Sequence, residues 1–328
     1  MIFWTKLKKP FFCVAPMYDV TDAPFRQIIA KYGKFNPSVG GPDVMFTEFV
    51  SADGLLSKGK DVLKQHLIFS ETERPIVAQL FGSKPETIKK ACELVVKMGF
   101  DGIDINMGCP DKSVLKQGAG AELIKNPKLA RQIICSAKEG AGEIPVSIKT
   151  RIGYNKNEIE KWLPELLAEN PVTITIHART KKEMSKVPAD WSVVMCAVEI
   201  RDSLKSKTLI IGNGDVKSRK EGLARAKETG CDGIMIGRGF FGKPWLLNEN
   251  FEPTTEQKLK ILLEHTKLFV KIFGDGPACA GRKHFDVMKK HFKAYVNGWD
   301  GAKELRTKLM ETKNAKDVEK IIHEYLKN

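Results

Sequence analysis

Several side chains that could do chemistry stand at the same kind of position in this sequence, directly after a short apolar run. They are Gln79, Asn106, Cys109, Lys149, His177, Arg179, Asn213 and Arg238. The carboxyl ends of parallel strands meet at one face of an α/β fold, so we expect these side chains to converge on one site. Their amide, ammonium, guanidinium and imidazole groups suit the binding of an anionic, ring-containing ligand.

Two glycine-rich turns are the expected phosphate-binding part of that site. Asn213–Asp215 and Gly237–Gly239 each follow an apolar run and lead towards a helix. Such turns let backbone N–H groups approach a phosphate. The amide of Gln79 can pair with the edge of a heterocycle, while Lys149 and His177 can stabilise negative charge on a reduced ring. The set indicates flavin mononucleotide (FMN) better than a dinucleotide, because no G-x-G-x-x-G motif follows the first predicted strand.

Cys109 is the candidate for a reactive side chain. It lies in Gly108-Cys109-Pro110, just past the fourth apolar run, where the following proline keeps it out of the helical conformation. Its thiol could act as a nucleophile or as a general acid that donates one proton, and a buried structural thiol is the alternative. The seven cysteines include no C-x-x-C pair, so neither a disulfide framework nor a zinc site is indicated.

The elements that must position these residues are eight short, β-branched apolar runs with helical patterns between them. The predicted strands are Phe12–Met17, Val44–Phe49, Ile76–Phe81, Gly102–Met107, Pro145–Arg151, Thr173–Arg179, Thr208–Gly214 and Gly233–Gly237. Nearly continuous apolar runs are typical of strands that are buried on both faces of a parallel sheet. Eight evenly spaced repeats predict an α/β fold of the (β/α)8 TIM-barrel type, with a doubly wound sheet as the alternative.

The pattern changes after Trp245. Helical periodicity covers Glu256–Phe273, Gly281–Val296 and Ala315–Leu326, with no convincing strand among them. We therefore predict two domains, a barrel over residues 1–248 and a small all-helical domain over residues 249–328.

The charge of the chain points to a class of partner. Lys and Arg number 54 and Asp and Glu 40, which gives a net charge of +14 over 328 residues. Such an excess favours a polyanionic partner, and a lysine-rich surface that serves solubility is the alternative. Arg282, Lys283, Lys289, Lys290 and Lys293 fall within about a third of the circumference of one predicted helix, as a phosphate-contacting or merely solvated face.

Composition also excludes some classes of protein. Hydrophobic residues make up 42% of the chain, too many for a disordered protein. No apolar run approaches the ~20 residues that span a bilayer. At the N-terminus the positive charges follow the apolar residues, the reverse of a signal peptide. We expect a cytoplasmic protein that binds neither a membrane nor a metal ion, and a monomer.

The motifs together resemble the tRNA-dihydrouridine synthase family. The resemblance is carried, in order, by APMYDVTDAPFR at 15–26, TEFVSADGL at 47–55, the Gln79 strand, INMGCPDKSVLKQGAGAEL at 105–123, SIKTRIG at 147–153, HARTKKEMSKVPADW at 177–191, GNGDV at 212–216 and GIMIGRGFFGKPWL at 233–246. It implies a TIM barrel with a helical tRNA-binding domain, bound FMN, and NADPH-dependent reduction of uridine to 5,6-dihydrouridine in tRNA.

The resemblance also implies a role for each matched residue. The flavin ring would be contacted by Pro16, Met17, Tyr18, Gln79, Lys149 and His177, and its phosphate by Asn213, Gly214, Asp215, Gly237 and Arg238. Asn106 and Arg179 would orient a uracil flipped out of its stack. Reduced FMN would give hydride to C6 of the uracil, and Cys109 would protonate C5. The sequence departs from the family pattern at Ala178 and over Met184–Pro188, a loop expected to lie over the site.

Two other functions remain open from the sequence. An FMN barrel that reduces a free pyrimidine, similar to dihydroorotate dehydrogenase, needs neither the net charge nor a basic helix. An RNA-binding protein without catalysis does not need Cys109, Lys149 and His177. The first alternative does not explain the net charge and the basic helix, and the second does not explain Cys109, Lys149 and His177.

Overall fold

The predicted barrel is confirmed in the computed structural model, which describes residues 3–33, 41–274 and 283–327. Eight strands form its wall: β1 (Phe11–Val14), β2 (Met45–Ser51), β3 (Ile76–Phe81), β4 (Gly102–Met107), β5 (Val146–Arg151), β6 (Thr173–His177), β7 (Leu209–Asn213) and β8 (Gly233–Ile236). Each lies within three residues of its predicted bounds. All neighbouring strands are parallel in the order β1-β8-β7-β6-β5-β4-β3-β2, and a bridge between Cys13 and Val44 closes the ring.

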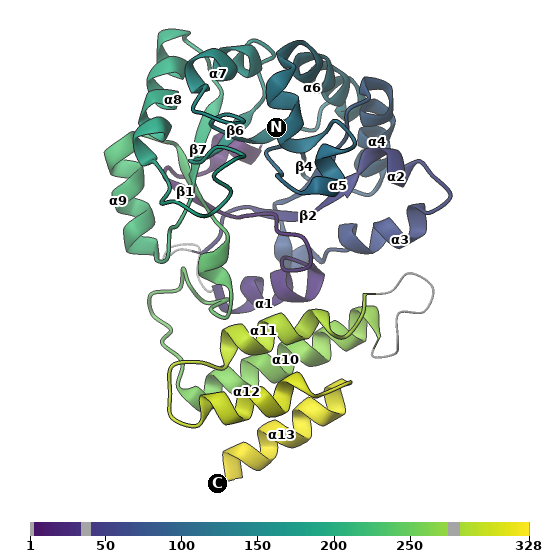
Figure 1. Cartoon of the computed structure of the whole chain (residues 1–328), viewed down its shortest axis with the longest axis vertical. Helices are drawn as coiled ribbons and strands as arrows, with labels where there is room; N and C mark the ends of the chain where they lie inside the picture. The colour runs from purple at the N-terminus through teal and green to yellow at the C-terminus, as the bar shows by residue number, and fades with distance from the viewer. Residues whose placement is uncertain (1–2, 34–40, 275–282, 328) are drawn as a thin grey trace.

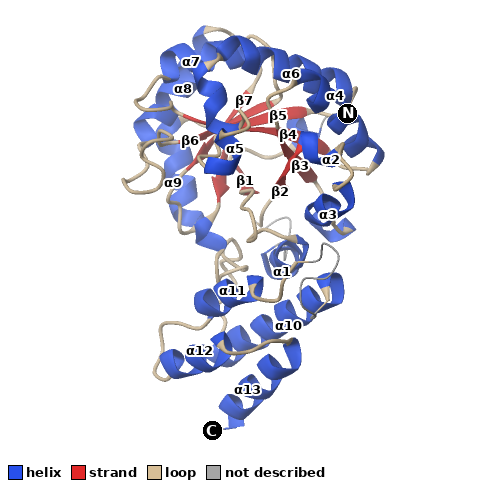
Figure 2. Cartoon of the chain, turned by 45° about the vertical axis from the view of Figure 1, so that its right-hand side comes forward, coloured by secondary structure: helices blue, strands red, loops and turns tan. Residues whose placement is uncertain are grey.

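Helices surround the strands, as Figure 2 shows with strands in red and helices in blue. The outer helices are α1 (Ala23–Gly33), α4 (Pro85–Lys97), α6 (Pro127–Ala141), α7 (Ile159–Leu167), α8 (Trp191–Ser203) and α9 (Arg219–Thr229). Short helices in the loops are α2 (Ala52–Leu55), α3 (Lys60–Lys64), α5 (Lys112–Leu115), η1 (Phe3–Lys6), η2 (Gln65–Leu67), η3 (Glu71–Glu73), η4 (Gly120–Lys125) and η5 (Arg238–Phe240). Alternate residues of each strand face the helices or the barrel interior, which buries both faces of the sheet.

The described residues of the C-terminal part of the chain form a helical bundle below the barrel (Figure 1). Its helices are α10 (Thr255–Phe273), α11 (Val287–Tyr295), α12 (Ala302–Met310) and α13 (Ala315–Lys327). The bundle has its own apolar core, which includes Leu262, Phe269 and Phe292 and extends to Ile28 of α1. Within the described residues, none of the helices has both the length and the apolar character that a bilayer crossing requires.

The bundle docks on α1 of the barrel. The ring of Phe25 stacks on His265 at a centroid distance of 5.3 Å and lies 4.8 Å from His291. At the edge of this contact, Lys31 Nζ and the Tyr32 hydroxyl each lie 2.6 Å from the carboxylate of Glu264. Apolar stacking with polar contacts at its rim fixes the bundle against the barrel.

One helix prediction in this region was wrong in its bounds, and one helix was not predicted. Residues 281–282 of the helix predicted over Gly281–Val296 lie outside the described residues, and among the described ones the helix spans Val287–Tyr295. The helix that was not predicted is α12. The reason for the late start is tertiary. Lys283 has its side chain buried against the barrel, which takes the chain before α11 away from a helical path.

Candidate active site

A cavity of about 950 Å³ opens at the carboxyl ends of the barrel strands. Most of the predicted site residues line it: Pro16, Met17, Gln79, Asn106, Cys109, Lys149, His177, Arg179, Asn213, Gly214, Asp215, Gly237 and Arg238. With Phe49 of β2, which also lines the cavity, side chains from all eight strand ends or the loops after them are brought together, as expected from the barrel topology.

Tyr18 differs from the other predicted cofactor contacts. It is not among the residues that line the cavity, and half of its surface is exposed. Its ring stacks on His66 at a centroid distance of 5.2 Å, and Phe49 lies 5.4 Å away. The structure therefore places Tyr18 beside the cavity, and its contact with a flavin stays a prediction.

A chain of hydrogen bonds fixes the amides at the floor of the cavity. The backbone N–H groups of Gly108 and Cys109 donate to Asn106 Oδ1 over 3.1 and 2.9 Å. Asn106 Nδ2 donates to Gln79 Oε1 over 3.0 Å, and Gln79 Nε2 donates to Asp104 Oδ2 over 2.7 Å. Backbone N–H donors stand at one end of this series of hydrogen bonds, and a carboxylate acceptor stands at the other. Only one orientation of each amide therefore gives every donor in the series an acceptor.

Asp104 is a site residue that the sequence interpretation missed. It is fully buried on β4, two residues before Asn106, and accepts a second hydrogen bond from Ser147 Oγ over 2.6 Å. Burial raises the pKa of Asp104 to about 6, against the hydrogen bonds from Ser147 and Gln79, which lower it. An ionisable residue in the middle of a buried strand is the signal that could have identified it.

The Cys109 loop is held from several sides. Its carbonyl oxygen accepts from Ala121 N over 3.0 Å. Gly120, the residue before Ala121, has a φ of +63°, and a Cβ at this position would lie 2.8 Å from the carbonyl oxygen of Cys109. The position therefore requires glycine. Burial raises the pKa of the Cys109 thiol above its ordinary value. A thiol that stays protonated at neutral pH suits a proton donor better than a nucleophile.

Arg151, the last residue of β5, also acts on this loop. Its Nε donates to the carbonyl of Gly108 over 2.8 Å, and its Nη1 donates to the carbonyls of Thr180 and Met184 over 3.0 Å each. It ties the Cys109 loop to the loop after β6. Its place at a strand end, inside the SIKTRIG motif, was the signal for a role that the sequence interpretation did not assign.

Cations dominate the charge of the cavity wall. Among the described residues, seven cationic side chains line it (Lys149, Arg151, Arg179, Lys186, Lys217, Arg238 and Lys243) against the carboxylates of Asp215 and Glu221. Burial, with the charge of Arg151 as a second cause, lowers the pKa of Lys149 to about 8. Burial and the charge of Lys149 lower the pKa of His177 far below its ordinary value, so the imidazole is neutral. The cavity is therefore prepared for an anionic ligand.

The residues of the predicted phosphate grip hold one another in place. Asn213 Oδ1 accepts from Lys149 Nζ over 3.0 Å, and its Nδ2 donates to the carbonyl of Met235 over 2.8 Å. Asp215 pairs with two arginines, Arg179 and Arg238, the latter over 2.7 Å. An aspartate repels a phosphate, so Asp215 is better suited to orient Arg238 than to contact the anion itself. Its direct contact with phosphate stays a prediction.

Arg179, predicted to orient a uracil, has several partners already. Its Nε donates to the carbonyl of Val187 over 2.6 Å, its Nη1 lies 3.3 Å from His177 Nε2, and its Nη2 pairs with Asp215. The side chain is buried at the cavity wall and joins the loop after β6 to the turn after β7.

The predicted basic face on the bundle is only partly realised. Arg282 lies outside the described residues. Lys283 does not belong to an exposed face, because it is 6% exposed and pairs with Glu48 and Asp19 of the barrel. Lys289 is half-buried and pairs with Asp286 at 2.6 Å, Lys290 is half-buried, and Lys293 is exposed. Lys289, Lys290 and Lys293 remain candidates for phosphate contact on α11.

Replacement of Lys149 by methionine should raise the melting temperature of the protein at pH 7 once bound small molecules have been removed. The folded protein holds Lys149 at a pKa near 8, below the ~10.4 of an unfolded lysine. It therefore binds fewer protons than the unfolded chain between those values, and its stability increases as the pH rises through that range. The difference in melting temperature between Lys149→Met and the wild type, measured by differential scanning calorimetry, should decrease between pH 8 and pH 10.

The control for this measurement is Lys207→Met, which removes an exposed lysine before β7. Its melting temperature should match that of the wild type at both pH values. If the Lys149→Met protein is no more stable than the wild type at pH 7, burial of the Lys149 ammonium group does not destabilise the folded protein.

Known proteins resemble this chain in sequence over nearly its whole length. The profile of the family described as Dihydrouridine synthase (Dus) matches residues 13–328. A probable tRNA-dihydrouridine synthase of Staphylococcus aureus (strain COL) is 40% identical over 326 residues, which cover 98% of this chain and 95% of that protein. A probable tRNA-dihydrouridine synthase 2 of Bacillus subtilis (strain 168) is 39% identical over 325 residues, covering 98% and 96%.

Solved structures confirm the barrel. Morphinone reductase superimposes with a TM-score of 0.51 at 13% identity, over 75% of this chain and 86% of that one. Histamine dehydrogenase from Rhizobium sp. 4-9 gives 0.52 at 15% identity, over 78% and 48%. Likeness at this level of identity establishes the fold.

In the described part of the chain, no three His, Cys, Asp or Glu residues are grouped so that they could hold a metal ion.

Proposed function

The chain belongs to the dihydrouridine synthase family, and on that premise we propose that it reduces uridine in tRNA to 5,6-dihydrouridine, with bound FMN as cofactor and NADPH as reductant. The observation that carries the proposal is the cavity itself. The thiol of Cys109, the amides of Gln79 and Asn106 and several cationic side chains line one space at the carboxyl ends of the strands.

The residues of the cavity fit a flavin. Its volume of about 950 Å³ lies at the upper end of the ~300–1,000 Å³ usual for ligand sites. The excess of cations matches a ligand with a phosphate and a ring that becomes anionic on reduction. In the proposal, Gln79 pairs with the ring edge, Lys149 and the neutral His177 lie at its polar end, and Arg238 contacts the phosphate. A reduced flavin bound there supplies the hydride.

The chain's own residues do the remaining work on the uracil. Addition of hydride at C6 builds negative charge towards O4, and a proton at C5 quenches it. Cys109 holds that proton, because burial keeps its thiol protonated. Asn106 fixes the position of Cys109, because its Oδ1 accepts hydrogen bonds from the backbone N–H groups of Gly108 and Cys109. Arg179 stands at the cavity wall, where it would limit the position of a flipped base.

A large anionic substrate also accounts for charge outside the cavity. Lys186, Lys217 and Lys243 line the cavity on the loops after β6, β7 and β8. Lys290 and Lys293 add positive charge on α11 of the bundle. We propose that tRNA lies across the barrel mouth and the bundle, and that these lysines contact its phosphates.

The proposal is tested with the purified full-length protein. Denaturation should release FMN, identified by its absorption spectrum and mass. Incubation with NADPH and unmodified tRNA should form dihydrouridine, measured by mass spectrometry of the digested tRNA. Free uracil, uridine and orotate serve as competing substrates. A colourless protein without flavin contradicts the flavin site, and turnover of free pyrimidine without turnover of tRNA contradicts the substrate.

Reversal of charge on α11 should weaken tRNA binding in a salt-dependent way. In Lys290→Glu/Lys293→Glu each lost phosphate contact lowers the slope of log affinity against log salt by about one unit. Lys207→Glu is the control, because it makes the same kind of change at an exposed lysine before β7. Affinity and slope are read from filter binding at several salt concentrations. An affinity equal to that of the Lys207→Glu protein would mean that this face of α11 contacts no RNA.

A further inference from the structure

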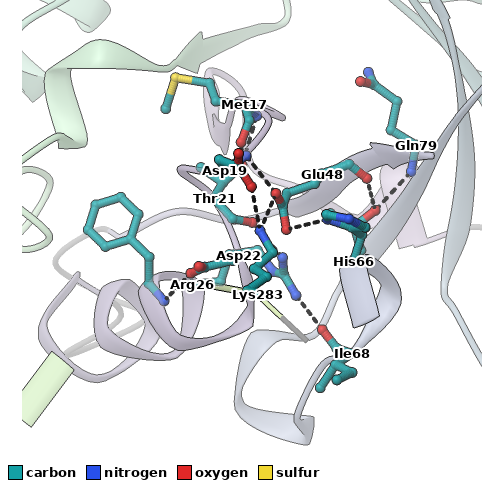
Figure 3. Close-up of polar contacts among 12 residues, drawn as sticks. Met17, Asp19, Thr21, Asp22, Arg26, Glu48, His66, Ile68, Gln79 and Lys283 are labelled. Carbon is teal, nitrogen blue, oxygen red and sulfur yellow. Dashed lines mark hydrogen bonds and ion pairs between the residues drawn. The ribbon is translucent and has the colours of Figure 1, made fainter. Parts of the chain in front are cut away.

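Lys283 is a lysine from the chain segment before α11 that has its side chain buried in the barrel. Its Nζ lies 2.7 Å from Glu48 Oε1 and 3.1 Å from Asp19 Oδ1 (Figure 3). Glu48 is fully buried, and its other oxygen lies 3.1 Å from His66 Nδ1. The site proposed above assigns no role to this cluster of charges.

The charges of the cluster depend on one another. Burial alone would raise the pKa of Glu48, but His66 and the charge of Lys283 together lower it to about 2. A buried carboxylate that loses its cationic partner pays the full cost of desolvation. Loss of Lys283 therefore removes one of the two partners that stabilise the Glu48 carboxylate, and His66 is the other.

Glu48 and Lys283 together hold the turn after β1. The backbone N–H of Asp19 donates to Glu48 Oε1 over 2.6 Å, and the side chain of Asp19 contacts Lys283. Asp19 has a φ of +54°, a conformation that non-glycine residues seldom adopt without support from their surroundings. The contacts with Glu48 and Lys283 provide that support.

The same turn carries residues of the cavity. Met17 and Thr21 are joined within it, since Met17 N donates to Thr21 Oγ1 over 2.8 Å and Thr21 N donates to Met17 O over 3.0 Å. Pro16 and Met17 line the cavity, and Met17 packs over Gly237, where a Cβ would lie 3.2 Å from its sulfur. A shift of Asp19 is thus transmitted over two residues to the cavity wall.

We propose that Lys283 is a positioning residue that completes the FMN pocket, by clamping the turn of residues 17–21 to Glu48 on β2 from outside the barrel. This rests on the proposed function for the identity of the ligand. In this proposal the bundle does more than contact RNA, because its contact with the barrel through Lys283 also determines the position of Met17.

The test compares two interdomain ion pairs in the full-length protein. Lys283→Met removes the clamp, and Lys31→Met removes the exposed pair with Glu264, which also joins barrel and bundle but lies away from the turn. With FMN removed, hydrogen–deuterium exchange of the backbone amides of residues 17–21 should be at least tenfold faster in Lys283→Met and unchanged in Lys31→Met. FMN titration followed by flavin fluorescence should then give at least a fivefold higher Kd for Lys283→Met alone.

The outcomes separate this inference from the proposed function. Equal exchange rates in the two variants overturn the clamp, whatever the ligand is. A wild-type protein that binds no FMN overturns the proposed function and leaves the exchange result valid. If Lys283→Met does not fold, Lys283→Met/Glu48→Gln avoids the unpaired carboxylate and should show the same faster exchange, and wild-type exchange in that protein overturns the clamp.

A double-mutant cycle tests the route through Asp19. Asp19→Asn weakens the same clamp from its other side, because it removes the charge that pairs with Lys283 at a half-buried position. If Lys283 acts through Asp19, the effects of Lys283→Met and Asp19→Asn on the Kd for FMN should be less than additive. Additive effects would mean that Lys283 does not act through the turn.

Discussion

Cys109→Ala is expected to lower the rate of dihydrouridine formation by about 10²- to 10⁴-fold, the usual contribution of a positioned general acid. The loop around Cys109 is held by Asn106, Arg151 and the backbone of Ala121, none of which depends on the thiol. FMN affinity and the reduction of the flavin by NADPH should therefore stay within about twofold of the wild type. The step to measure is the reoxidation of reduced flavin by tRNA in a single turnover.

The pH profile adds a second check on the role of Cys109. Burial raises the pKa of the thiol, so the proton that it donates is present at neutral pH and is lost only as the pH rises through that raised value. Activity that depends on Cys109 should fall on the alkaline side, and Cys109→Ala should lack that fall. Cys135→Ala, at an exposed cysteine on α6, is the control. Full activity of Cys109→Ala would show that another group supplies the proton.

Asp104→Leu is expected to raise the Kd for FMN and lower the turnover rate, with a combined loss of about 10- to 100-fold. The leucine leaves Gln79 Nε2 without its acceptor, and a buried donor without a partner costs about 1–3 kcal/mol. The amide of Gln79 is then free to rotate, and with it the orientation of Asn106 and the loop of Cys109. FMN titration and steady-state kinetics with tRNA measure the two parts of the loss.

Asp104→Asn separates the hydrogen bond from the charge. Its amide oxygen can accept from Gln79, and its amide nitrogen can donate to Ser147, whose hydroxyl lies 3.4 Å from the carbonyl of Ile103. The chain of hydrogen bonds is kept, so activity should return to within about threefold of the wild type. The protein should also be at least as stable at neutral pH, because burial raises the pKa of Asp104 to about 6 and makes its charged form costly. An Asn variant as impaired as the Leu variant would assign the effect to charge.

Much of the site was predictable from the sequence, because the barrel repeats one local rule. Each apolar run of four to seven residues forms a strand, and the polar residue at its end must lie at the carboxyl face. Gln79, Cys109, Lys149 and His177 were identified in this way, and all four line the cavity. The order of the motifs likewise pointed to the family that the comparisons confirm.

Contacts between residues far apart in the chain were decided only by the tertiary structure. Lys283 belongs to a basic helical pattern in the sequence, yet its side chain pairs with Glu48, which lies 235 residues away. The helix α11 therefore begins only at Val287. Local periodicity reports which residues share a face, but a buried charge is stabilised by a partner that sequence spacing does not reveal. For the same reason, the link from Asp104 through Gln79 to Cys109 and the pairing of Asp215 with two arginines became visible only when the strands stood side by side.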